Sequence, residues 1–244
     1  MYSRLRVRKR PRNTLPVGLG ETMQRQIDQE LNALRSLILD MGKAVERSVE
    51  EATQGLIERN AERLERVRDI EKSVNQYHLE VDEKCLKIIA SQSPLAADLR
   101  MILAIIKINS DLERMGDQAV NIAYNVRDYL KKEPLKEASI ITQMATAVRK
   151  MITDSLDAFI RSDTKLSEEV LIQDDAVDEG KQEMFRNLVA LMKVEPQSVD
   201  AAVDLMLVSR NLERLGDHAT NIAEDVIFAS TGKDIRHGGI SKKP

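Results

Sequence analysis

Apolar residues recur at intervals of three and four along most of the chain, which is the spacing of one face of an α-helix. The pattern begins near Glu21 and is interrupted often enough to divide into six segments. The last segment opens at Pro196 and ends at Gly232. The predicted helices cover approximately residues 21–58, 61–90, 94–133, 135–161, 164–193 and 196–231. We therefore predict an all-α protein.

Capping and breaking residues define the predicted helix ends. Asn60 and Asp163 can each cap the helix that follows, because a side-chain oxygen at this position accepts hydrogen bonds from free backbone amides. Ser93 is predicted to cap the third helix in the same way, with Pro94 at its first helical position. Pro134 must end that helix, since proline removes a hydrogen bond and clashes with the preceding turn.

The chain contains nearly the same line twice: DLERMGDQAVNIAYNV begins at Asp111, and NLERLGDHATNIAEDV begins at Asn211. Earlier positions correspond at a separation of 103, through the pairs Asn60 and Asp163, Val67 and Val170, Val74 and Val177, and Asn75 and Asp178. We interpret these matches as the duplication of a three-helix bundle. The predicted organisation is, in order, a basic arm (1–20), a first bundle (21–133), a second bundle (134–230) and a C-terminal tail (231–244).

Both repeated lines lie on an apolar seam whose positions step alternately by three and four, as in left-handed helix packing. The seam positions are Ile105, Ile108, Leu112, Met115, Ala119, Ile122 and Val126, and then Leu205, Val208, Leu212, Leu215, Ala219, Ile222 and Val226. Gly116 and Gly216 lie beside the seam. We expect the missing side chains there to permit close helix approach.

The composition is that of long packed helices, with 42% hydrophobic and 32% charged residues but only 3% aromatic ones. Cys85 is the one cysteine, which excludes an internal disulfide framework and a cysteine zinc cluster and fits a reducing compartment. No apolar run approaches the roughly 20 residues that span a bilayer, and no signal peptide is recognisable. A cytoplasmic protein is expected.

The net charge of −3 is unevenly distributed, since residues 1–20 contribute +6 and the remainder −9. The basic side chains of this arm are Arg4, Arg6, Arg8, Lys9, Arg10 and Arg12. Such an arm could contact nucleic acid or an anionic membrane, but a solvated tail is the favoured interpretation. Nucleic-acid binding also lacks stacking aromatic residues and a recognition module.

The third helix of each repeat carries acids on the face away from the seam. Glu113 and Asp117 are one turn apart, and Asn121 extends their stripe. The second copy supplies Glu213, Asp217 and Asn221. Two interpretations stay open at this point. The acids form a solvated surface paired with Arg114 and Arg214, or they bind a metal ion.

The second helix of each bundle could complete a metal site. Glu71 and Asn75 are four apart in the first repeat, and Asp174 and Asp178 stand at the matching positions of the second. His78 and Asp82 continue the first stripe, where the second repeat has Lys181 and Phe185. Oxygen ligands suit hard cations, so the candidates are iron, manganese, magnesium or calcium, with zinc also considered.

Paired carboxylates can also serve acid–base catalysis or a di-iron centre. However, neither repeated line has the histidine three residues after its glutamate that a ferritin-like site needs, and no Ser/His/Asp set or phosphate-cradling glycine loop is visible. His218 follows Asp217 directly and is predicted to be a surface or interface residue, while His237 is expected to stabilise the tail. We expect no enzymatic activity; the alternative is a carboxylate-bridged metalloenzyme or a metal-storage helical protein.

Five segments together resemble the PhoU family, in the family's order and spacing over about residues 21–239. They are LERMGD, LERLGD, IEKSVNQYHLEVDEKCLKIIASQSPLAADLR, DDAVD and GKDIRHGG. The resemblance implies tandem three-helix bundles with E/D-x-x-x-D motifs that bind metal ions in some members. Three pairs match that motif fully: Glu113/Asp117, Glu213/Asp217 and Asp174/Asp178.

The pair Glu71/Asn75 departs from the motif, because an amide replaces the second acid. An amide oxygen can still ligate a hard cation but brings no charge. The second repeat offers four carboxylates and the first only three, so the sequence predicts that the second site fills first.

The resemblance also implies a function, that of a cytoplasmic regulator of phosphate uptake and phosphate homeostasis. PhoU-like proteins are expected to act as negative regulators of the phosphate-starvation response. The implied partners are a PhoR-like sensor histidine kinase, held in its inhibitory state, and a phosphate ABC transporter with a PstB-like ATPase. A homodimer is expected from the frequency of two-fold assemblies, and partners could recruit it to the inner membrane face.

Overall fold

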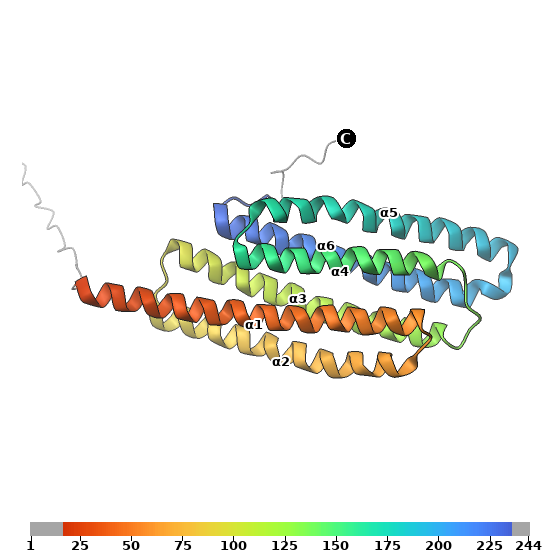
Figure 1. Ribbon diagram of the computed structural model, residues 1–244, viewed down its shortest axis with the longest axis horizontal. Coiled ribbons are helices and arrows are strands. Elements are labelled where there is room, and N and C mark those ends of the chain that lie inside the picture. Colours follow the sequence, from red (N-terminus) through yellow and green to blue (C-terminus); the bar gives the residue numbers. More distant parts are fainter. Residues whose placement is uncertain (1–16, 236–244) are drawn as a thin grey trace, which may run out of the picture.

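The computed structural model describes residues 17–235, and this part of the chain is helical without any strand. Figure 1 shows six long helices lying side by side. Their bounds are α1 (Val17–Ile57), α2 (Ala61–Gln92), α3 (Ala96–Tyr129), α4 (Ala138–Arg161), α5 (Thr164–Val194) and α6 (Val199–Thr231), with a short 3₁₀ helix η1 (Pro196–Ser198) before α6. The all-α prediction of two three-helix sets is confirmed.

The helices form two layers. One layer has the order α2, α3, α6 and α5. In it, α3 packs on α6, α2 packs on the other side of α3, and α5 packs on the other side of α6. The second layer consists of α1, which packs on α2 and α3, and α4, which packs on α5 and α6; α1 and α4 also touch. The side of the four-helix layer that is turned away from α1 and α4 is therefore covered by none of the described helices. We call this side the open face.

The apolar seam forms the core, as predicted. Every seam position of α3 and α6 is buried, and Leu112 and Leu212 have no exposed surface. A Cβ atom at Gly116 would lie 3.2 Å from Val74 Cγ1, which is closer than ordinary van der Waals contact, so the glycine lets α2 approach α3 without a shift of Val74. Gly216 serves the same role between α5 and α6. The predicted close helix approach is confirmed at both glycines.

Polar contacts connect the two repeats where α3 packs on α6. Asp111 Oδ1 lies 2.8 Å from His218 Nδ1 and accepts a hydrogen bond of 3.2 Å from Asn221 Nδ2. Lys107 Nζ reaches the buried Asp225 with an N–O distance of 3.2 Å. His218, which was expected at the surface or at an interface, thus lies at the contact between the two repeats.

Two of the predicted caps are confirmed. Asn60 accepts a hydrogen bond of 2.9 Å from the backbone amide of Glu62, and Asp163 accepts from the amides of Lys165 and Leu166. The cap predicted at Ser93 is wrong. This residue ends α2 in the left-handed conformation, with a φ of 45°, and α3 begins only at Ala96 without a side-chain cap.

The physical reason for the error at Ser93 is the length of α2, which continues to Gln92. Pro94 cannot continue that helix, so the residue before it is used to end α2 and is not available to start α3. At the other end, α1 begins at Val17, four residues before the predicted start. Pro16 stands directly before it, and proline is well tolerated at the start of a helix. The basic side chains of residues 1–16 and His237 lie outside the described residues.

Truncation of a seam leucine tests this core. Leu112→Ala and Leu212→Ala are each expected to lower the free energy of unfolding by about 2–5 kcal/mol, because they leave a cavity in a packed interior. Asp117→Ala is the control, since Asp117 is exposed on the open face. Urea unfolding followed by circular dichroism measures all three. A loss at Asp117 as large as that at Leu112, measured without metal, would contradict the assignment of the two faces.

Candidate functional site

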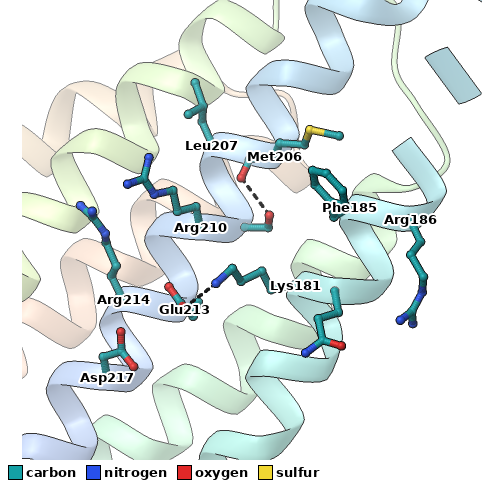
Figure 2. A pocket seen from close by; sticks show the side chains of 11 residues that line it. Lys181, Phe185, Arg186, Met206, Leu207, Arg210, Glu213, Arg214 and Asp217 are labelled. Atoms are coloured by element: carbon teal, nitrogen blue, oxygen red, sulfur yellow. Dashed lines mark hydrogen bonds and ion pairs between the residues drawn. The ribbon is translucent and has the colours of Figure 1, made fainter. Parts of the chain in front are cut away.

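In the second repeat, α5 and α6 bring three of the predicted acids together on the open face. Glu213 and Asp217 stand one turn apart on α6, and Asp178 faces them from α5. Lys181, one turn beyond Asp178, points at Glu213 with an Nζ–Oε1 distance of 2.5 Å (Figure 2). The cation that the acids of this repeat attract is therefore Lys181. Among the described residues, neither Arg214 nor its counterpart in the first repeat forms an ion pair with these stripes.

The crowding of the acids makes the ionised form of Asp217 less favourable. Partial burial of its carboxyl group raises the pKa of Asp217 above its usual value, and repulsion by Glu213 and Asp178 raises it further. His218 and Lys181 act in the opposite direction but do not cancel these effects. A carboxylate that is held beside two others favours either a proton or a bound cation.

Asp174 differs from the expectation that the acids lie on the outer surface. It is only 8% exposed, and its Oδ1 is 3.1 Å from where a Cβ atom at Gly216 would stand. The physical reason is the glycine itself, because the space left on α6 admits the short aspartate side chain from α5. Of the four carboxylates predicted for the second site, Asp174 therefore lies under α6 and the other three lie nearer the surface.

In the first repeat, the amide of Asn75 is already engaged, since its Nδ2 donates a hydrogen bond of 2.6 Å to Glu71 Oε1. Glu113 is half-buried and Asp117 is exposed on the open face. Asn121 is also exposed. Its counterpart Asn221 is not, because it turns toward the other repeat to contact α3, as described above. The stripe of the second repeat thus ends at Asp217.

His78 and Asp82, which continue the first stripe, are engaged in contacts with each other and with α3, and so they are not available as metal ligands as they stand. Asn109 Nδ2 donates to the backbone oxygen of His78 at 3.0 Å and to Asp82 Oδ1 at 2.9 Å. His78 Nε2 lies 3.6 Å from Asp82 Oδ2. These contacts fix α2 to α3, so His78 and Asp82 have a structural task that their spacing in the sequence did not indicate.

The donors of both stripes are carboxylate and amide oxygens, which suit a hard cation. Within residues 17–235, however, no three carboxylate, imidazole or thiol groups are gathered closely enough to hold a metal ion as the side chains stand. The chemistry of the acids therefore fits a metal, and ligation would require their side chains to turn toward a common point. In the second repeat, Glu213 would also have to leave Lys181.

A groove that the residue pattern did not predict lies between α5 and α6, beside the acids of the second repeat. It has a volume of about 740 Å³. Its lining residues are Lys181, Gln182, Phe185 and Arg186 on α5, and Met206, Leu207, Ser209, Arg210, Glu213, Arg214 and Asp217 on α6. The sequence did contain one indication of the groove. Phe185 occupies a position on the acid stripe where a solvated surface would carry a polar side chain rather than an aromatic ring. Of the helices that the structure describes, none has the length and apolar character needed to cross a membrane.

Neutralising Asp217 tests the crowding of the acids. In the presence of a chelator, Asp217→Asn is expected to raise the thermal midpoint at neutral pH. As the pH rises through 3.8, the unfolded chain loses this proton before the folded protein does, so ionised Asp217 disfavours folding from there upward. At lower pH both states are protonated and the cost vanishes. The gain should therefore shrink as the solution is acidified.

The matched control is Asp117→Asn in the first repeat. Asn75 stands there in place of Asp178, so one source of repulsion is absent and the gain should be smaller. Thermal unfolding of the three proteins, followed by circular dichroism over a range of pH, measures both effects. Equal gains for the two variants, or a gain that does not depend on pH, would contradict the proposed electrostatics.

Known proteins similar to this chain agree on its family. The family model described as the PhoU domain matches twice, at residues 38–126 and 141–226, which are the two repeats. A phosphate-specific transport system accessory protein PhoU homolog from Pseudomonas putida is 36% identical over 92% of this chain and 88% of that protein. A homolog of the same name from Aquifex aeolicus is 36% identical over 88% of this chain and 97% of its own length.

Solved structures give the same result. The crystal structure of PhoU from Pseudomonas aeruginosa is 36% identical, with a TM-score of 0.82 over 84% of this chain and 99% of that one. The phosphate transport system regulatory protein PhoU from Streptococcus pneumoniae is 27% identical, with a TM-score of 0.80 over 86% of this chain. With both repeats matched in sequence and the same fold found in crystals, the chain belongs to the PhoU family.

Proposed function

We propose that this chain is a non-enzymatic regulator of phosphate uptake that restrains the phosphate-starvation response when phosphate is plentiful. The observation that carries the proposal is the match of both repeats to a family whose relatives are named accessory or regulatory proteins of phosphate transport. The match extends over nearly the whole described chain, so the accessory role is inferred for the two-bundle scaffold as a unit.

In this proposal, the partners are a sensor histidine kinase and the ATPase of a phosphate ABC transporter, as the family resemblance implies. A regulator of this type works by binding one state of its partner better than another. The layered fold suits that task, because α1 and α4 stiffen the four-helix layer from one side and leave the open face available. A homodimer recruited to the inner face of the membrane by these partners is the proposed assembly.

The acids of the open face are the proposed metal ligands. Glu71, Asn75, Glu113 and Asp117 would hold an ion in the first repeat, and Asp174, Asp178, Glu213 and Asp217 would hold one in the second. A bound cation would supply positive charge where like charges repel, as they do around Asp217. Iron, manganese, magnesium and zinc are the ions to test. The ion pair between Lys181 and Glu213 offsets one carboxylate, which reduces the charge advantage that the second site has in the sequence.

Deletion of the gene tests the regulatory role. A strain without this protein is expected to express phosphate-starvation genes in phosphate-rich medium, because the inhibitory state of the kinase is no longer favoured. A reporter under a starvation promoter measures the effect, with the complemented strain as control. Normal repression in a clean deletion strain that has no second member of the family would overturn the proposal.

Metal titration tests the two acid sites. Calorimetry with each candidate ion is expected to resolve two binding events, one of which disappears in the double variant Asp174→Asn with Asp217→Asn. Lys181→Gln should strengthen the second site, since it removes the competing cation, and Asn75→Asp should strengthen the first by adding charge. Bound metal should also raise the thermal midpoint, and a chelator should reverse the rise. If no metal binds at micromolar concentrations, the proposal of metal sites is wrong and the acids form a solvated surface.

A further inference from the structure

The groove between α5 and α6 has an apolar floor. Phe185 leans from α5 toward Met206 on α6, and Leu207 extends from α6 on the same side as Arg210 (Figure 2). The ring of Phe185 is 59% exposed and Leu207 is 38% exposed. An aromatic ring that is left this open on a packed helix is the kind of side chain that anchors a protein interface.

Cationic side chains stand along both edges of the groove. Arg186 extends from α5 on the side away from α6, while Arg210 and Arg214 extend from α6 on the side away from α5 (Figure 2). Because the arginines stand apart on opposite edges, they do not converge on one point as they would around a single phosphate group. Lys181 is already paired with Glu213 inside the groove.

The apolar surface continues along α6 beyond the groove. Val199, Val203 and Leu207 are all exposed and stand four residues apart, so they lie on one side of the helix. At 1.5 Å per residue they extend over about 12 Å. The combined surface is therefore elongated, and its length corresponds to two turns or more of a helix laid along it.

The duplicated fold does not explain this surface, because the first repeat has a different set of side chains at the matching positions. Asp82 and Glu83 stand where the second repeat has Phe185 and Arg186. Ser110 stands where the second repeat has Arg210, and Lys107 where it has Leu207. Arg214 and Val203 have counterparts of the same kind in Arg114 and Leu103, so the features specific to the second repeat are the aromatic ring and the arginines at positions 186 and 210, together with Leu207.

We propose that the groove between α5 and α6 binds an amphipathic helix of a partner protein, with apolar side chains on one face and Asp or Glu residues along both edges. The apolar face would cover Phe185 and Met206 between the helices and Leu207 at the α6 edge, and the acids would meet the arginines on either side. This is the geometry in which a helix is recognised by an apolar groove with complementary charge at its rim. The proposal goes beyond the regulatory function and does not depend on which partner that function uses.

An anionic membrane is the other surface that exposed apolar and basic residues attract. The groove fits it less well, because it is concave and because Glu213 and Asp217 line the same wall and would repel anionic lipid. A helical partner can follow a concave surface, whereas a bilayer needs a protruding one. We therefore treat binding to vesicles as an outcome that contradicts the proposal.

The test uses the full chain and a labelled helical peptide of about 18 residues, or five turns, with Leu on one face and Glu beside it. Fluorescence anisotropy should show saturable binding. A peptide with Lys in place of Glu should bind far more weakly. Leu207→Ser and Arg214→Glu should each weaken binding of the Glu peptide by about tenfold, as interface anchors do.

The first repeat supplies matched controls. Leu103→Ser changes a leucine of similar exposure on α3, and Arg114→Glu changes the counterpart of Arg214; neither residue lines the groove. Both variants should bind the Glu peptide as the unchanged protein does, and circular dichroism should show all four variants folded. Absence of saturable binding, equal losses in the controls, or binding to phosphatidylglycerol vesicles in place of the peptide would overturn the proposal.

Discussion

Burial of one apolar seam on α3 and another on α6 is the constraint on which the rest of the structure depends. The two helices use the seams to pack on the other helices of their own bundles, and α1 and α4 cover the layer from the same side. A helix that is fixed in this way has no rotational freedom, so the residues opposite its seam must face outward. The acids, the exposed arginines and the groove are therefore positioned by the burial of the two seams.

The duplication preserved this constraint and the acids of the third helix, and it changed other side chains of the open face. The seam residues and the glycines beside them are apolar or small in both repeats because a change there opens a cavity or forces the helices apart. Exposed positions of α2 and α5 carry no such penalty, and there the repeats have diverged in charge. His78 is tied to Asp82 and Asn109 in the first repeat, whereas Lys181 holds Glu213 in the second. Two sites with the same origin now have different electrostatics.

The sequence was sufficient for what depends on periodicity within one helix. It predicted six helices, both seams, the close approach at Gly116 and the caps at Asn60 and Asp163. It was insufficient where the outcome depends on distances between helices. The burial of Asp174 depends on the space at Gly216 across the helix pair, and the ion pair of Lys181 depends on how α5 lies against α6. The groove was missed for the same reason, since concavity is a property of two helices together.

Glu213 and Asp217 belong to two sites at once, because both line the groove and both are candidate metal ligands. A cation held by these carboxylates would add positive charge to one wall of the groove and would change its attraction for an acidic partner. Thermodynamic linkage then requires that the partner change the affinity for the cation by the same factor. Such coupling needs no movement of the core, since it acts through charge on a surface that the packed seams hold in place. The shared acids are thus the point at which a metal-dependent signal and a protein contact could meet in one rigid scaffold.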